Sequence, residues 1–196
     1  MKIDYNKKMH EEISSFGEKP KLLLHCCCAP CSSAVIERIK EFFDITFYYY
    51  NPNIYPQEEF VIRQNEFQKL GVKIVVEDYN HESFLKLVKG KENEKEGGIR
   101  CQICIADRLN KSFEYAVQNN FDLVTTTLSI SPHKDAEFIN LLGENLEKKY
   151  GIKYLHADFK KQNGYLRSIQ LCKELNIYRQ DYCGCEFSIT GNEKKD

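Results

Sequence analysis

The feature that most constrains the fold is a short apolar run, Leu22–Leu24, which leads directly into the cysteine-rich turn Cys26–Cys31. Such a run predicts a buried strand, and Pro30 suits the first turn of a following helix because its φ is already helical. In open α/β sheets, ligands bind in the crevice beyond the carboxyl ends of the strands. A helix N-terminus also favours negative charge, so we expect thiolates here that bind a metal or react as nucleophiles.

Neighbouring cysteines in this turn do not readily form a disulfide with each other, because the required geometry distorts the backbone. They can, however, share one metal centre. The alternative is that they are small apolar side chains of the core, as isolated buried cysteines often are. A cluster at a strand end is less common, so we favour a metal or redox site.

The rest of the chain alternates between predicted strands and helices. Strands are expected at residues 21–26, 44–50, 72–77, 122–126 and 153–155, and helices at 5–16, 31–43, 56–70, 81–88, 100–118, 132–149 and 165–175. This alternation is typical of a parallel sheet with helices on both faces. We predict an α/β fold: a doubly wound, Rossmann-like or HUP-like, mostly parallel five-stranded sheet with flanking helices and a Cys-rich C-terminal tail. Neither a repeat nor a linker is evident, so residues 1–196 are predicted to form a single metalloenzyme domain.

Composition narrows the functional classes. The chain has no apolar run of about 18 residues that could span a membrane, and residues 1–8 lack the apolar core of a signal peptide. We therefore expect a cytoplasmic protein with no membrane partner. In a reducing compartment its 9 cysteines favour metal or redox chemistry over structural disulfides. The net charge of −1 attracts no nucleic acid at long range, so any RNA-binding surface must be local.

A second thiol pair, Cys101 and Cys104, forms a CxxC motif at the start of a predicted helix. One such motif is equally consistent with zinc and with a redox pair. Together with Cys27 and Cys28 it supplies four thiolates, the number that holds either zinc or an iron–sulfur cluster. Because Cys27 and Cys28 lie at the predicted ligand crevice, structural zinc is the less favoured interpretation.

The tail contains a third thiol pair, Cys183-Gly184-Cys185. Glycine tolerates the backbone angles of a small strained disulfide, and strained disulfides are redox-active. The pair could instead bind a second metal ion, or be incidental. Asp107, one turn after Cys104, could reach a metal centre or donate a proton, although a solvated helix surface is its default interpretation.

Other strand ends leave alternatives open. The tyrosines of Tyr48–Tyr50 could stack on a nucleobase or simply pack in the core. The hydroxyl-rich turn Thr125–Ser131 could hold a phosphate or cap a helix. Cys172 is expected in the core, and Cys26 is ambiguous. A Gly-rich phosphate loop does not follow the first strand, so ATP chemistry is not expected.

Five motifs occur in order along nearly the whole chain. They are His25-x-Cys27-Cys28-Ala29-Pro30-Cys31; Tyr50-Asn51-Pro52-Asn53-Ile54 with Pro56, Glu59 and Arg63; Arg100-Cys101-x-x-Cys104 with Arg108-Leu109; Thr126-Thr127-Leu128-Ser129-x-Ser131-Pro132; and Asp158-Phe159-Lys160-Lys161 through Tyr178-Arg179-Gln180-x-Tyr182-Cys183-Gly184-Cys185. In these motifs the chain resembles the QueH-type epoxyqueuosine reductases.

This resemblance implies removal of the epoxide oxygen of epoxyqueuosine in tRNA, the last step of queuosine synthesis, without cobalamin. It also implies a [4Fe-4S] cluster, with Cys27, Cys28, Cys101 and Cys104 as ligands, and a redox pair, Cys183 and Cys185. A second iron is a further expectation, with Cys31 or Asp107 serving it. The expected partners are the epoxyqueuosine-modified anticodon of tRNA and an external electron donor.

Two other functional classes fit parts of the pattern. One is a zinc-stabilised nucleic-acid-binding module without catalysis. The other is an iron–sulfur tRNA-thiolating enzyme of the ATP pyrophosphatase type, which needs the phosphate loop that the sequence does not show.

Overall fold

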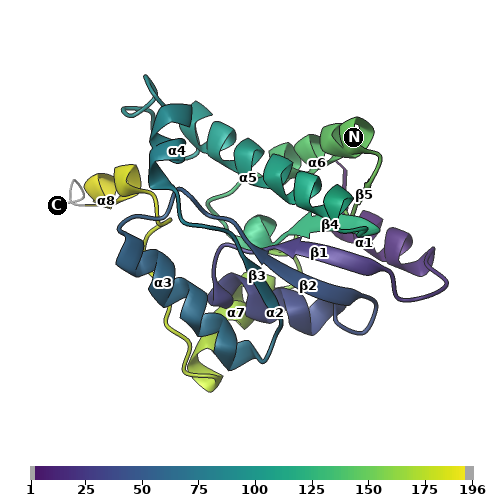
Figure 1. Ribbon diagram of the computed structural model, residues 1–196. Coiled ribbons are helices and arrows are strands. Elements are labelled where there is room, and N and C mark those ends of the chain that lie inside the picture. The colour runs from purple at the N-terminus through teal and green to yellow at the C-terminus, as the bar shows by residue number, and fades with distance from the viewer. Residues whose placement is uncertain (1–2, 193–196) are drawn as a thin grey trace.

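The computed structural model describes residues 3–192 and contains a five-stranded, all-parallel sheet at its centre (Figure 1). The strands are β1 (Lys21–His25), β2 (Asp44–Tyr49), β3 (Ile74–Val76), β4 (Leu123–Thr126) and β5 (Lys153–Tyr154). Their order in the sheet is β3-β2-β1-β4-β5. The predicted doubly wound α/β fold is thereby confirmed.

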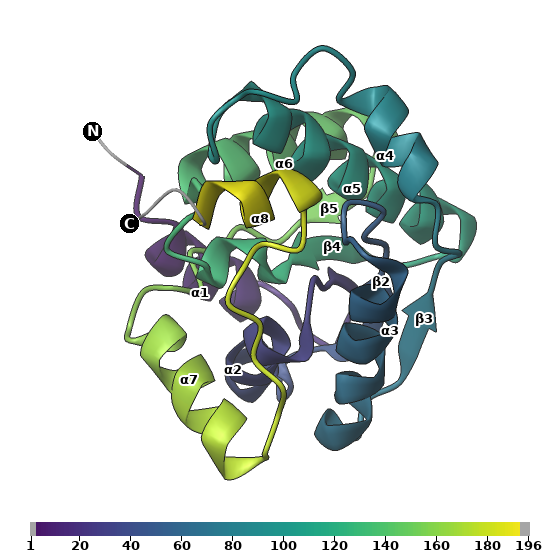
Figure 2. The ribbon, with the colours of Figure 1, turned by 90° about the vertical axis from the view of Figure 1, so that its left-hand side faces the viewer.

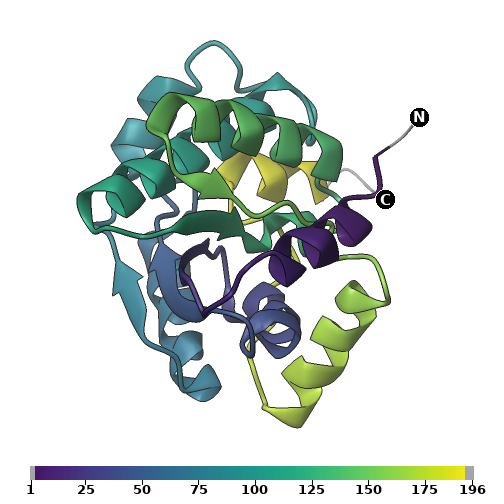
Figure 3. The same ribbon diagram turned by 90° about the vertical axis from the view of Figure 1, so that its right-hand side faces the viewer.

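Helices cover both faces of the sheet, as Figure 3 shows from the side. One face carries α1 (Tyr5–Ser14), α2 (Ala29–Ile39), α3 (Gln57–Asn65) and α7 (Gly164–Glu174). The other carries α5 (Ile99–Gln118) and α6 (Ala136–Tyr150), and α4 (His81–Leu87) contacts α5. A last helix, α8 (Glu186–Asn192), follows the segment after α7.

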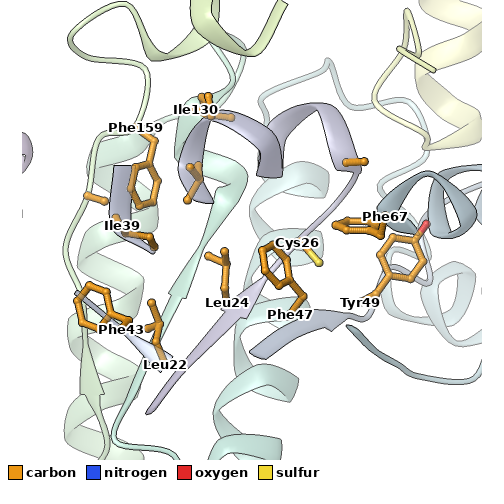
Figure 4. Close-up of a cluster of buried hydrophobic side chains, with 14 of the residues drawn as sticks. Leu22, Leu24, Cys26, Ile39, Phe43, Phe47, Tyr49, Phe67, Ile130 and Phe159 are labelled. Atoms are coloured by element: carbon orange, nitrogen blue, oxygen red, sulfur yellow. The ribbon is translucent and has the colours of Figure 1, made fainter. Parts of the chain in front are cut away.

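Strand β1 is buried on both faces, which explains its uninterrupted apolar sequence. Leu22 and Leu24 pack with Ile39 and Phe47 on the α2 side, as Figure 4 shows. Leu23 points to the opposite side and packs among residues of α5 and α6. The period of two along a strand thus divides one apolar run between two cores.

Several element boundaries differ from the prediction for local reasons. The helix expected from residue 132 begins at Ala136, because the Asp135 carboxylate caps it by accepting from the Glu137 and Phe138 amides. Before it lies a 3₁₀ helix, η2 (Thr127–Ile130), and α3 continues as a second one, η1 (Glu66–Leu70). Helix α8 lies in the predicted tail, where no element was expected. None of the helices within residues 3–192 is long and apolar enough to cross a membrane.

Candidate active site at the carboxyl edge of the sheet

A cavity of about 270 Å³ lies where the chain leaves β1 and β4. β1 continues into α2 on one face and β4 leads to α6 on the other, so the cavity occupies the point at which the winding reverses. Segments far apart in sequence line it: Cys27, Pro30 and Cys31 after β1; Leu128, Ser131, His133 and Lys134 after β4; Arg63 of α3, Arg108 of α5 and residues 179–183. The crevice expected from the sequence is therefore present.

Three cysteines face one another on one side of this cavity. Helix α2 begins two residues earlier than predicted, so Cys28 is its N-cap residue and Cys31 lies in its first turn. The sulfur atoms of Cys27, Cys28 and Cys31 all lie within 4.8 Å of one another, and the Sγ atoms of Cys27 and Cys28 are 3.7 Å apart. Hydrogen bonds from the Cys27 and Cys31 thiols lower the pKa of Cys28 well below its usual value. These three cysteines form a cluster that could bind a metal.

Polar side chains of neighbouring strands hold this turn in place. The buried His25 ring lies with Nε2 3.2 Å from the Tyr50 carbonyl oxygen and Nδ1 2.9 Å from Thr126 Oγ1. Burial, followed by the charge of Arg108, lowers the pKa of His25 to about 3. The ring is therefore neutral, and because a carbonyl can only accept, Nε2 carries the proton. The result is a fixed link between the ends of β1, β2 and β4.

The other thiols lie around a buried arginine rather than within the three-cysteine cluster. Arg108 is only 3% exposed and donates to the Cys104 carbonyl oxygen at 3.3 Å and to Asn51 Oδ1 at 3.2 Å. Burial opposes its charge, yet the thiols of Cys104, Cys183 and Cys27 raise the pKa of Arg108. Thiols from three distant segments therefore interact with one cation.

Cys104 and Cys185 occupy an apolar part of this arrangement. They pack with Phe84 and Val88 in a small separate cluster. Burial raises the pKa of Cys104 to about 11 and that of Cys185 to about 12. Cys101 is half-buried and its sulfur accepts from the Gly97 amide at 3.3 Å.

Cys183 faces the cavity and has a lysine beside it. Lys134 Nζ lies 3.4 Å from Cys183 Sγ and 3.5 Å from Glu96 Oε1. Burial disfavours the ammonium, but Cys183, Cys101 and Glu96 together raise the pKa of Lys134, so it remains charged. The sequence interpretation gave no role to Lys134 or Arg108. Only their positions in the sequence could have indicated a role at the site: Lys134 follows the turn after β4, and Arg108 lies one helical turn after Cys104.

Arg63 holds the segment that carries Cys183. Its guanidinium is 2% exposed, pairs with Glu59 at 2.6 Å, and donates to the carbonyl oxygens of Cys183 at 3.2 Å and Tyr182 at 3.4 Å. Gly184 has φ 104°, and a Cβ there would lie 2.8 Å from Arg63 Nη1. The backbone of this segment can therefore approach Arg63 only because residue 184 is glycine.

Some predicted site residues lie outside the cavity lining. The Asp107 carboxylate accepts from the Tyr50 hydroxyl at 3.2 Å, and burial raises the pKa of Asp107. Cys26 is buried and donates to the Tyr48 carbonyl oxygen, and Cys172 is in the core as expected.

Burial decides one open alternative for Tyr48 and Tyr49, though not for the half-buried Tyr50, and a capping bond is present in the other. Tyr48 and Tyr49 have no exposed surface and bond to Glu77 and the Phe60 carbonyl, so they pack rather than stack on a base. In the hydroxyl-rich turn, Thr126 Oγ1 caps η2 by accepting from the Leu128 amide at 3.2 Å.

Comparison with known proteins places these residues in a family context. The family model described as epoxyqueuosine reductase QueH matches residues 22–191. A protein named epoxyqueuosine reductase QueH from Staphylococcus epidermidis is 41% identical, over 95% of this chain and 85% of its own length. Proteins of the same name from Streptococcus pyogenes serotype M1 and Thermotoga maritima are 42% and 34% identical, over 95% and 89% of this chain and 78% and 93% of their own lengths.

Proposed function

Because this chain belongs to the epoxyqueuosine reductase QueH family, we propose that its cysteine-lined cavity removes the epoxide oxygen of epoxyqueuosine in tRNA. The chain is accordingly an oxidoreductase of queuosine biosynthesis. In this reaction both C–O bonds of the epoxide break, a C=C bond forms, and two electrons and two protons convert the oxygen to water. The observation that supports it most directly is that Cys27, Cys183 and Arg108 line one cavity, while Arg108 donates to the Cys104 carbonyl oxygen at 3.3 Å. The zinc-binding module and the thiolating enzyme have no comparable support.

The donor set fits an iron–sulfur cluster. Thiolates are the ligands of such clusters, and the buried Arg108, whose hydrogen bonds go to the Cys104 carbonyl and the Asn51 side chain, offsets the negative charge of several thiolates. We propose that Cys27, Cys28, Cys101 and Cys104 hold a [4Fe-4S] cluster, and that Cys31 serves a second iron. A cluster bound there would supply electrons one at a time.

The remaining proposed roles belong to the chain's own side chains. We propose that Cys183 and Cys185 form the redox pair that exchanges electrons with an external donor. The Lys134 ammonium, 3.4 Å from Cys183 Sγ, places a positive charge beside this member of the pair. Asp107 is proposed as a proton source, because its raised pKa favours a carboxyl group that retains its proton.

Metal analysis of anaerobically purified protein tests the ligand assignment. The wild-type protein should contain iron and sulfide and give an electron paramagnetic resonance signal on reduction. Cys27→Ala and Cys104→Ala should each give colourless protein. Cys26→Ala is the matched control, because Cys26 is adjacent to Cys27 but its thiol bonds to Tyr48. Full iron content in the first two variants would refute the assignment.

Activity assays test the redox pair. Exchanging both Cys183 and Cys185 for serine should abolish formation of queuosine while the iron content and visible absorbance persist. Cys172→Ser serves as the control, since this thiol lies on α7 and points into the core. Turnover that survives the double exchange would show that this pair is not required.

A further inference from the structure

We propose that Arg179, supported by the ring of Tyr165, binds a backbone phosphate of the RNA strand at the entrance of the cavity. This inference rests on the proposed function, which brings a modified anticodon to the cavity. The inference goes beyond that function by naming the residue that anchors the RNA and the chemical group that this residue binds.

The two residues form a preassembled pair. Arg179 lies in the segment between α7 and α8, which Figure 2 shows running past α2, and Tyr165 lies in the first turn of α7. The guanidinium carbon of Arg179 lies 5.2 Å from the centroid of the Tyr165 ring. Both residues line the cavity, and Arg179 is exposed. An aromatic support of this kind restricts the guanidinium before RNA arrives.

Arg179 differs from the other cavity cations in its charge balance. Arg63 pairs with Glu59, and Lys134 pairs with Glu96. Arg108 lies buried among thiols. In the described part of the chain, the ion pairs do not include Arg179, whose close partners are the side chains of Cys172 and Tyr165. Its positive charge at the entrance is therefore available to an anion.

RNA phosphate is the anion that fits this position. The chain as a whole carries a net charge of −1, so it does not attract RNA at long range and needs local contacts. A guanidinium matches the geometry of a phosphate because it can donate two parallel hydrogen bonds. A phosphate contact positions the strand without reading its sequence, which suits a cavity that must receive one particular nucleoside.

The salt dependence of RNA binding tests this proposal. The probe is an anticodon stem-loop RNA with guanosine at the modified position, and its affinity is measured over a range of potassium chloride concentrations. Each phosphate contact contributes about 0.7 to 0.9 to the slope of log K against log salt. We expect Arg179→Ala to reduce the slope by that amount, and Arg179→Lys, which keeps the charge, to preserve it.

Arg167→Ala is the matched control. Arg167 lies on α7 and is partly exposed at the surface, but its guanidinium pairs with Glu37 and Glu174 at 2.8 and 2.9 Å. Its removal changes the net charge by the same amount and should leave the slope unchanged. An unchanged slope in Arg179→Ala, or an equal reduction in Arg167→Ala, would overturn the proposal. The proposal would also be overturned if Arg179→Lys lost as much affinity as Arg179→Ala while keeping the wild-type slope. That result would indicate that the guanidinium stacks on a base.

Failure of this inference can be told apart from failure of the proposed function. Binding of the unmodified RNA does not require reduction, so the salt slope can be measured in either case. A wild-type protein that binds RNA through Arg179 but forms no queuosine would refute only the function. A protein that forms queuosine with a slope independent of Arg179 would refute only the phosphate contact.

Discussion

Two cysteine-bearing regions of the cavity are held in different ways. The β1–α2 turn (residues 26–31) is held by main-chain bonds that continue the sheet and helix, from the Cys26 amide to Tyr48 and from the Ser32 amide to Cys28, in addition to the side chains of His25 and Asn51. The C-terminal segment (residues 178–185) is held largely by side chains, above all Arg63. The turn with the three-cysteine cluster is therefore part of the framework, whereas the segment with Cys183 can be released by changes in a few side chains.

Arg63→Met is expected to give the largest difference between the two regions, because it should change the C-terminal segment and leave the β1–α2 turn intact. The change leaves the buried Glu59 carboxylate without its partner, which typically costs about 3–5 kcal/mol of unfolding free energy, and releases two carbonyls of the C-terminal segment. Urea unfolding should show the loss of stability. Alkylation of Cys183 should become faster, while the iron content of the protein stays at the wild-type level.

A double variant distinguishes the charge effect from the positioning effect. Glu59→Gln with Arg63→Met removes the unpaired carboxylate, so part of the stability should return. Cys183 should remain as reactive as in the single variant, because its carbonyl still lacks the guanidinium. If alkylation slowed in step with the recovered stability, Arg63 would have no separate positioning role.

A smaller effect of the same kind is expected from Gly184→Ala. The positive φ of 104° and the 2.8 Å approach to Arg63 Nη1 both disfavour a Cβ, with a cost of roughly 1–3 kcal/mol. Turnover should fall while iron content stays at the wild-type level. Gly17→Ala is the control, because its Cβ would meet no atom within 4 Å. Loss of iron together with turnover would show that the two regions are not separable.

The smallest effect on stability concerns Asp107, which neighbours Arg108 on α5 and whose pKa is raised by burial. As a proton donor it must be protonated, so turnover should decline as the pH rises through its native pKa. Asp107→Asn should lose this limb of the pH profile together with most activity. A profile that keeps the limb in the variant would exclude Asp107 as the donor.

The raised pKa of Asp107 also predicts how the free energy of unfolding depends on pH. A native carboxyl pKa above its unfolded value means that folding disfavours the carboxylate, so stability increases as the pH falls through the native pKa. Asp107→Asn should therefore be slightly more stable than the wild type at about pH 7, with a smaller advantage at about pH 5. Urea unfolding at both pH values measures the difference.

Local patterns were sufficient for much of the fold. The run Leu22–Leu24 predicted a strand buried on both faces, since strands covered by helices on both sides need no polar alternation. The first residue of a helix was less predictable where a capping side chain sets it. Asp135 moves the start of α6 by capping it, and residues 132–134 form a turn between η2 and α6 instead.

By itself, the sequence determined that thiols gather at the carboxyl end of a central strand, because the apolar run and the following proline specify a strand–helix turn. Only the tertiary structure decided which cysteines meet. Cys27, Cys28 and Cys31 form one group, Cys183 lines the same cavity as Cys27 and Arg108, and Arg108 donates to the Cys104 carbonyl oxygen. That meeting depends on β4 lying beside β1 and on α5 covering one face of the sheet. Local periodicity carries no information about contacts between segments so far apart in the chain.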